Sequence, residues 1–261
     1  MANQVASTTV EEWGPWMKSL LKRALARTPY RVIRASDRNR FAAQQETLLT
    51  LCGRGFAPKR IVDGGANVGD FARMIHSIFS HASIDLVEPQ PACRPVLEAL
   101  ARSAPGHVLH AVAIGSERGT LSMAFDPEVP STGAYVAKPE DTAQSPGFHT
   151  VPVETLDSIL LGATVEDRVL LKLDLQGWEL EALCGARRVL PVVEVILTEV
   201  SFFAQAYEPP IAALVGFLAD QGFVLDDIAS LIARRRDNRA HQADFVFIRA
   251  DSPLNSDKAW A

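Results

Sequence analysis

A glycine-rich turn near residue 65 has the residue types of a cofactor site. It runs Asp63-Gly64-Gly65-Ala66-Asn67-Val68-Gly69, after a short apolar segment and before a helical pattern. Glycines allow the backbone to turn sharply and a ligand to approach closely. A dinucleotide site would have its middle glycine where Ala66 stands, and Asp63 would repel a pyrophosphate. A carboxylate there suits the ammonium and sulfonium groups of S-adenosylmethionine, so we predict that cofactor.

Further contacts for this cofactor are expected where later strands end. Glu88, followed by Pro89, can accept hydrogen bonds from both hydroxyls of a ribose. Ala113 and Ile114 end the third expected strand, where the adenine should rest. The complete set of predicted cofactor contacts is Asp63, Gly64, Gly65, Ala66, Asn67, Gly69, Glu88, Pro89, Ala113, Ile114, Asp174 and Gln176.

Three carboxylates near the fourth and fifth expected strands are the catalytic candidates: Asp174, Glu199 and Glu179. Attack by a hydroxyl on a methyl group needs a base to take the proton. We predict that Asp174 or Glu199 is that base, or that both act through a bound divalent cation. Glu179 falls in the first turns of a helix, where the dipole favours a carboxylate, so a structural role is equally open. His149 is an outside candidate.

The elements that must position these residues alternate between strands and helices, which is typical of a parallel sheet with crossover helices. Strands are expected over 60–63, 83–88, 107–114, 169–174 and 192–200. The last two strands, 223–228 and 244–249, are joined without a crossover helix and should be antiparallel. This pattern predicts an α/β, Rossmann-like fold of the class I methyltransferase type, with a seven-stranded sheet and a reversed final hairpin.

The chain is expected to have three parts. Residues 1–58 form a helical extension, which we interpret as a lid over the site. Residues 59–250 form the cofactor-binding domain, and a stretch over 126–150 rich in Pro, Gly, Ser and Thr is interpreted as an inserted substrate loop. Residues 251–261 are a tail.

Taken together, these segments resemble the FkbM family of methyltransferases. The resemblance covers about residues 60–249 and rests on 62–69, Glu88-Pro89, 154–157, 172–180, 185–186, 198–202 and 244–247. It implies O-methylation, the transfer of a methyl group to a hydroxyl oxygen of a sugar, a glycan or a natural product. Gly64 departs from the family, which usually has a small apolar residue there. Residues 1–58 and 126–150 lie outside the shared motifs, so the resemblance does not identify the acceptor.

The charge and hydrophobicity of the sequence indicate which partners and which cellular location to expect. The net charge of −5 combines +5 over residues 1–58 with −10 over the rest, and this acidic body argues against duplex nucleic acid as the substrate. No apolar run is long enough to cross a bilayer and no secretory signal is present, so a cytoplasmic location is expected. The alternatives left open are a nicotinamide-dependent oxidoreductase, a non-catalytic domain that retained the fold, and a nucleic-acid methyltransferase that uses the basic segment.

Overall fold

A computed structural model of the chain describes residues 40–137, 147–203, 209–234 and 236–256. The chain divides into two units, residues 1–39 and 40–261, and all described residues belong to the second. The predicted lid over residues 1–58 therefore falls largely outside the described residues. So does the middle of the predicted substrate loop.

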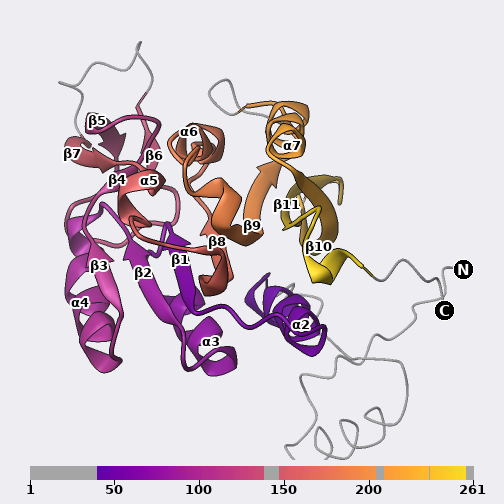
Figure 1. Cartoon of the computed structure of the whole chain (residues 1–261). Helices are drawn as coiled ribbons and strands as arrows, with labels where there is room; N and C mark the ends of the chain where they lie inside the picture. Colours follow the sequence, from indigo (N-terminus) through magenta and orange to yellow (C-terminus); the bar gives the residue numbers. More distant parts are fainter. Residues whose placement is uncertain (1–39, 138–146, 204–208, 235, 257–261) are drawn as a thin grey trace, which may run out of the picture. The chain divides into compact units, whose positions relative to one another are not determined.

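A seven-stranded sheet forms the centre of the second unit (Figure 1), in the order β10-β11-β9-β8-β1-β2-β3. Its strands are β1 (Arg60–Gly64), β2 (Ser83–Val87), β3 (Val108–His110), β8 (Val169–Leu173), β9 (Val193–Ser201), β10 (Phe223–Ala233) and β11 (Ala240–Arg249). Five neighbouring strands of this sheet, β9, β8, β1, β2 and β3, are parallel. Strand β11 is antiparallel to both β9 and β10. This is the class I methyltransferase fold with its reversed final hairpin, as predicted.

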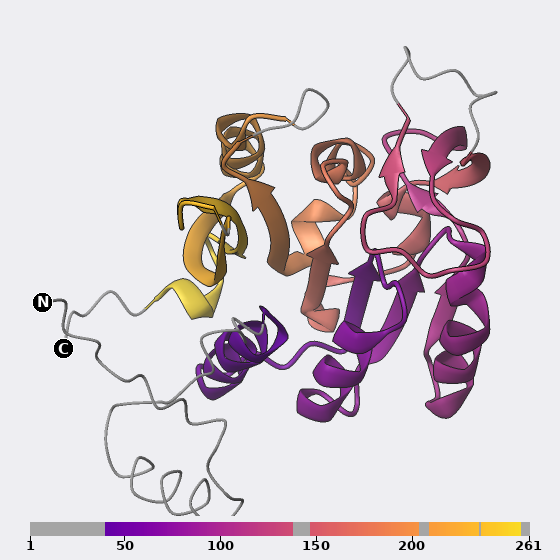
Figure 2. The ribbon, with the colours of Figure 1, turned by 180° about the vertical axis from the view of Figure 1, so that it is seen from behind.

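The central strands are apolar because both faces of the sheet are covered. Successive side chains point to opposite faces, so neighbours such as Ile61 and Val62, or Leu170 and Leu171, enter different core clusters. One face packs against α2 (Arg40–Gly53), α3 (Asp70–Ile78) and α4 (Arg94–Ser103). The other packs against α5 (Leu156–Ile159), α6 (Glu179–Cys184) and α7 (Ile211–Asp220), as the views from both sides show (Figures 1 and 2).

A second, smaller sheet departs from the expected pattern. The segment 107–114, expected to be one strand, is divided: β3 joins the large sheet, whereas β4 (Ala113–Ile114) joins the small one. The small sheet has the order β4-β7-β5-β6, with β5 (Gly119–Ala124), β6 (Tyr135–Val136) and β7 (Phe148–Glu154). The chain leaves the large sheet after His110 because Ala113 and Ile114 pair with Val153 and Glu154 of β7 instead.

The helix α2 packs closely on the sheet-bearing domain although it precedes the first strand. Leu48 and Leu51 are each 1% exposed and belong to the same core cluster as α3. The helix contacts β10 and α3. Residues 40–53 are therefore part of the compact unit, while the predicted boundary at residue 58 stays a prediction. Within the described residues, no helix is long and apolar enough to cross a membrane.

Candidate active site

The glycine turn after β1 brings that strand against the end of β8. Gly65 has a φ of +74°, and a Cβ at this position would lie 2.0 Å from the backbone oxygen of Asp174. Gly69, with a φ of +81°, precedes α3, and a Cβ there would lie 2.7 Å from a methyl carbon of Leu100. Gly65 is thus needed for its conformation and for the close backbone approach, and Gly69 for its conformation.

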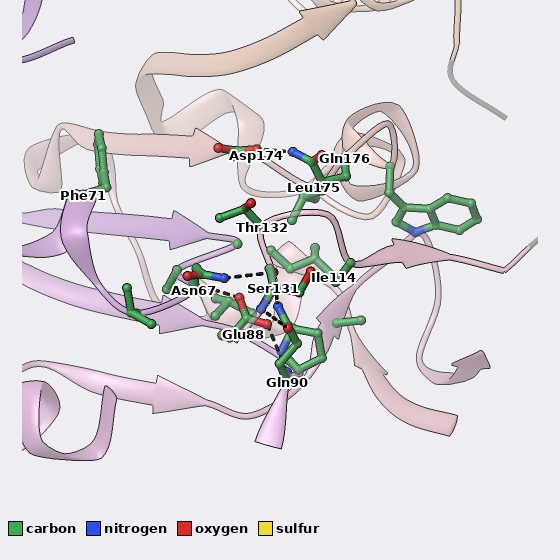
Figure 3. Close-up of a pocket in the computed structure, with 18 of the residues that line it drawn as sticks. Asn67, Phe71, Glu88, Gln90, Ile114, Ser131, Thr132, Asp174, Leu175 and Gln176 are labelled. Atoms are coloured by element: carbon green, nitrogen blue, oxygen red, sulfur yellow. Dashed lines mark hydrogen bonds between the residues drawn. The ribbon is translucent and has the colours of Figure 1, made fainter. Parts of the chain in front are cut away.

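A cavity of about 240 Å³ opens above this turn, at the carboxyl ends of the parallel strands. Figure 3 shows part of its lining, with Glu88 on one side and Asp174 and Gln176 on the other. Its lining includes most of the predicted cofactor contacts, namely Gly65, Ala66, Asn67, Glu88, Pro89, Ala113, Ile114, Asp174 and Gln176. Three predicted contacts, Asp63, Gly64 and Gly69, are not in this lining.

Asp63 lies beneath the turn in a buried ion pair. The Lys172 ammonium donates to Asp63 Oδ1 at 2.9 Å and to the backbone oxygens of Gly64 and Gly65 at 3.1 and 3.0 Å. Burial would lower the pKa of Lys172, but the charges of Asp63 and Asp174 raise it, so the lysine stays charged. Asp63 thus has a protein cation as its neighbour, and its predicted contact with the cofactor stays a prediction.

Glu88 is buried at the cavity wall and is held by the backbone. Its Oε2 accepts from the Asn67 N–H at 2.8 Å and its Oε1 from the Gln90 N–H at 3.0 Å. Burial raises the pKa of Glu88, although these hydrogen bonds oppose the shift. The two bonds fix the carboxylate in a defined orientation beside the glycine turn.

The loop before β6 is tied to the same wall. The Gln90 amide donates to the backbone oxygen of Ser131 at 2.9 Å and accepts from its N–H at 3.0 Å. The Asn67 side chain donates to the same Ser131 oxygen at 3.0 Å (Figure 3). Ser131 and Thr132 consequently line the cavity. Neither Gln90 nor Ser131 was predicted as a cofactor contact, although Ser131 lies within the predicted substrate loop, and no motif in the sequence points to this pairing.

The carboxylates Asp174 and Glu199 share one guanidinium. Arg40 Nη1 lies 2.9 Å from Asp174 Oδ2 and 3.0 Å from Glu199 Oε2. Burial would raise the pKa of Asp174, but the charges of Lys172 and Arg40 lower it. Burial and then the charge of Asp174 raise the pKa of Glu199 to about 8, with Arg40 opposing. Asp174 is therefore the carboxylate that is charged at neutral pH.

The three catalytic candidates differ in what they face. Asp174 lines the large cavity, whereas Glu179 and Glu199 line a neighbouring cavity of about 20 Å³. Glu179 Oε1 accepts from the Leu175 N–H at 2.7 Å and from the Gly177 N–H at 3.4 Å. Burial raises the pKa of Glu179 to about 7. This geometry gives Glu179 a structural task, the support of the turn that follows Asp174.

His149 is not brought to the cavity. It lies in β7, where its ring stacks on Phe125 with 4.7 Å between the ring centroids. Its position in the small sheet therefore gives no support to a catalytic role.

The sequence of the chain is similar to known methyltransferases. A sequence model of the Methyltransferase FkbM domain matches residues 63–225, more than half of the chain. The chain belongs to the FkbM methyltransferase family. A curated relative, methyltransferase sdnD of Sordaria araneosa, is 27% identical over 215 residues, covering 68% of this chain and 82% of the relative.

Solved structures similar to this FkbM methyltransferase are more distant. A methyltransferase FkbM from Methylobacillus flagellatus KT is 18% identical with a TM-score of 0.45, covering 72% of this chain. The match spans 43% of that protein's length. A magnesium protoporphyrin IX methyltransferase (ChlM) from Synechocystis PCC 6803, solved with bound S-adenosylmethionine, is 11% identical with a TM-score of 0.45. Its match covers 89% of this chain and 96% of that one.

The cavity of this FkbM methyltransferase is lined by groups whose chemistry suits S-adenosylmethionine. Gly65 lets the turn lie directly against the Asp174 backbone at the base of the cavity, and Glu88 presents a fixed carboxylate. The Trp178 side chain lines the cavity, and its buried indole N–H has no hydrogen-bond partner among the described residues. Such an unpartnered buried donor costs about 1–3 kcal/mol and is a feature that a polar ligand can satisfy. As a member of the FkbM family, the enzyme is an S-adenosylmethionine-dependent methyltransferase.

The described residues offer little support for a metal ion in this FkbM methyltransferase. Among the described residues, no group of three or more His, Cys, Asp or Glu side chains is arranged to hold a metal ion. The divalent cation considered between Asp174 and Glu199 would have to share its place with Arg40.

Proposed function

We propose that this enzyme transfers the methyl group of S-adenosylmethionine to a hydroxyl oxygen of a small molecule, either a sugar or glycan or a natural product. The observation that carries the proposal is Asp174, a charged carboxylate in the wall of the cofactor cavity. An alcohol is a poor nucleophile until its proton is removed, and a positioned carboxylate is a suitable acceptor. The family match favours methyl transfer over the nicotinamide-dependent alternative.

Each group at the cavity has a task in this proposal. Bound S-adenosylmethionine supplies an electrophilic methyl carbon. Glu88 accepts hydrogen bonds from the ribose hydroxyls, and Ala113 and Ile114 provide the apolar surface for the adenine. Asp174 accepts the proton of the acceptor hydroxyl and also orients that oxygen.

Two neighbouring side chains orient the Asp174 carboxylate. The Gln176 amide donates to Asp174 Oδ1 at 3.0 Å, and Arg40 pairs with Oδ2. These two contacts fix the plane of the carboxylate while its other lone pairs remain for the acceptor. Glu199, with its raised pKa and its place outside the cavity lining, is the weaker candidate for the base.

The first test is calorimetric titration with S-adenosylhomocysteine, with NAD run in parallel. We expect binding of S-adenosylhomocysteine alone, at micromolar concentration. Acceptor screening then measures S-adenosylhomocysteine release with sugars, glycosides and hydroxylated natural products. A methylated amine or thiol as the only product would refute the hydroxyl assignment, and no product at all would favour the non-catalytic alternative.

The variant D174N tests the base. We expect kcat to fall by about 10²–10⁴-fold, because general-base catalysis contributes about that much. The affinity for S-adenosylhomocysteine should change far less, since asparagine keeps the size of the side chain. The matched control is D251N, which changes an exposed aspartate paired with Arg249 and should leave turnover unchanged. Full turnover by D174N would remove Asp174 from catalysis.

A further inference from the structure

Arg40, the first residue of α2, connects three acidic side chains from three other parts of the fold. Its guanidinium contacts Asp174 after β8, Glu199 on β9 and Asp244 on β11. Arg40 also lines the cofactor cavity. It lies outside the residues that the family model matches, 63–225. The family resemblance therefore does not assign it any role.

The fork of the guanidinium is anchored on Asp244. Arg40 Nε lies 2.8 Å from Asp244 Oδ2 and Nη2 lies 2.5 Å from Oδ1, a bidentate pairing. Asp244 is itself held by the Gln44 amide at 2.9 Å and by the Ser230 hydroxyl. This anchoring leaves Nη1 as the nitrogen that extends between the other two carboxylates.

Nη1 occupies the place that a shared cation would need. It lies 2.9 Å from Asp174 Oδ2 and 3.0 Å from Glu199 Oε2. A Mg²⁺ or Ca²⁺ ion bridging the same two oxygens would lie about 2.0–2.6 Å from each, which leaves no room for the guanidinium. Two positive charges in one position would also repel each other strongly.

The charge balance of the cluster explains why a cation is required there. Glu199 and Asp244 are nearly buried, with side chains 6% and 2% exposed. Acidic groups this close and this far from water disfavour one another's charge, which raises the pKa of Glu199, and a positive charge among them opposes that effect. Burial would lower the pKa of Arg40, but the hydrogen bond and charge of Asp244 and the charges of Asp174 and Glu199 raise it, so the guanidinium remains charged.

We propose that Arg40 is the resident cation of the methyl-transfer site, a positioning residue that takes the place of a divalent metal between Asp174 and Glu199. This inference rests on the proposed function of Asp174. The guanidinium keeps Asp174 charged and correctly oriented, so deprotonation of the acceptor hydroxyl needs no metal ion. Lysine would not serve equally well, because its single ammonium cannot bind Asp244 in a bidentate way and reach both other carboxylates.

The test is calorimetric titration with Mn²⁺ of the full-length protein without cofactor or acceptor. Wild type should show no binding, whereas R40M should bind Mn²⁺ with a dissociation constant of about 10⁻⁴–10⁻³ M, the range of weak carboxylate sites. Adding D174N to R40M should abolish that binding. R54M is the matched control: it removes the Arg54–Asp226 ion pair just after the same helix and should gain no Mn²⁺ site.

Two results would overturn the inference. One is Mn²⁺ binding by wild type that D174N abolishes, which would make the site a true metal site. The other is a folded R40M that binds no Mn²⁺, which would mean that Arg40 does not hold a cation position. The comparison of wild type with D174N needs no Arg40 variant, so it decides the question even if R40M fails to fold. No arm uses S-adenosylhomocysteine or turnover, so failure here is distinct from failure of the proposed function.

Discussion

A methyl group added at Gly65 would lie 2.0 Å from the backbone oxygen of Asp174, a contact that no side-chain rotation can relieve. We expect G65A to lower the free energy of unfolding by about 2–4 kcal/mol, because backbone strain and a clash add. It should also abolish binding of S-adenosylhomocysteine. Urea unfolding and calorimetry measure the two effects.

The control for this substitution is G162A. Gly162 has a φ of +80° but nothing within 4 Å of its Cβ position, so only the strain of about 1 kcal/mol applies. Equal losses in the two variants would show that the contact with Asp174 is unimportant.

Glu179 gives a pH dependence whose sign can be worked out. Burial raises its pKa from 4.5 to about 7, so the folded state holds the proton more tightly than the unfolded chain does. Its contribution to stability is therefore complete below the unfolded pKa and is lost as the pH rises through the folded one. Between about pH 5 and about pH 8, wild type should lose roughly 1–3 kcal/mol relative to E179Q.

Denaturant unfolding of both proteins at the two pH values measures this difference. Glutamine keeps an oxygen that can accept from the Leu175 and Gly177 N–H groups, so the turn after Asp174 should survive the change. E181Q, an exposed glutamate on the same helix, is the control and should follow wild type. Parallel curves for wild type and E179Q would contradict the assignment.

At the residue scale, the predicted residues that line the cavity lie within short motifs. Glu88 and Asp174 line the cavity because each directly follows a strand at the same edge of the large sheet, whereas Ala113 reaches it from β4 of the small sheet. The partner of Asp63 was missed, yet a signal existed: Lys172 is a charge inside an otherwise apolar, buried strand and therefore needs a partner. Arg40 carried no such signal, because its partners are 134 or more positions away in the sequence.

At the scale of elements, the loop before β6 is held by Gln90, which makes two hydrogen bonds to the Ser131 backbone, and by Asn67, which makes one. In Q90A, both hydrogen bonds between Gln90 and the Ser131 backbone are lost. Two such bonds contribute about 1–3 kcal/mol, so amide exchange of Ser131 should accelerate by about tenfold or more. Hydrogen exchange measured by mass spectrometry on peptides covering residues 129–135 tests this.

The affinity for S-adenosylhomocysteine should weaken in parallel, because Ser131 and Thr132 line the cavity. Exchange in β8 should stay unchanged, which separates local loosening from general destabilisation. Q221A, at the end of α7 and outside the cavity lining, serves as the control variant. Unchanged exchange at Ser131 in Q90A would mean that the loop is held by other contacts.

The large sheet was predictable and the small one was not, for a physical reason. Strands β1, β8 and β9 are apolar on both faces, and the missing crossover helix before β11 required an antiparallel pair. The strands β4 and β6 have two residues each, too few for a pattern. Their position depends on pairing with β7 and β5, which the local sequence does not encode.

At the scale of the whole molecule, the predicted lid over residues 1–58 lies outside the described part of the chain except for residues 40–58. A deletion that tests it should end at residue 39, because Arg40 lies in the site and Leu48 and Leu51 lie in the core. We expect the protein lacking residues 1–39 to fold and to bind S-adenosylhomocysteine as wild type does. If the segment is a lid, turnover should fall by tenfold or more, roughly the effect of admitting water and losing acceptor alignment.

Thermal unfolding, calorimetry and turnover of the deleted protein are the measurements. Normal turnover would refute the lid hypothesis. Loss of the fold would mean that residues 1–39 belong to the stable unit.

The contact between Arg40 and Asp244 has a consequence for how the enzyme is made. The two residues are 204 positions apart, so Arg40 leaves the ribosome long before its anchor does. At about 5–20 residues per second, the interval is about 10–40 s. During that time the carboxylates of β8 and β9 emerge without a fixed countercharge, and any product that terminates before β11 lacks the anchor permanently. Under the proposed role of Arg40, competence for methyl transfer is thus acquired only after β11 has been synthesised and has entered the sheet.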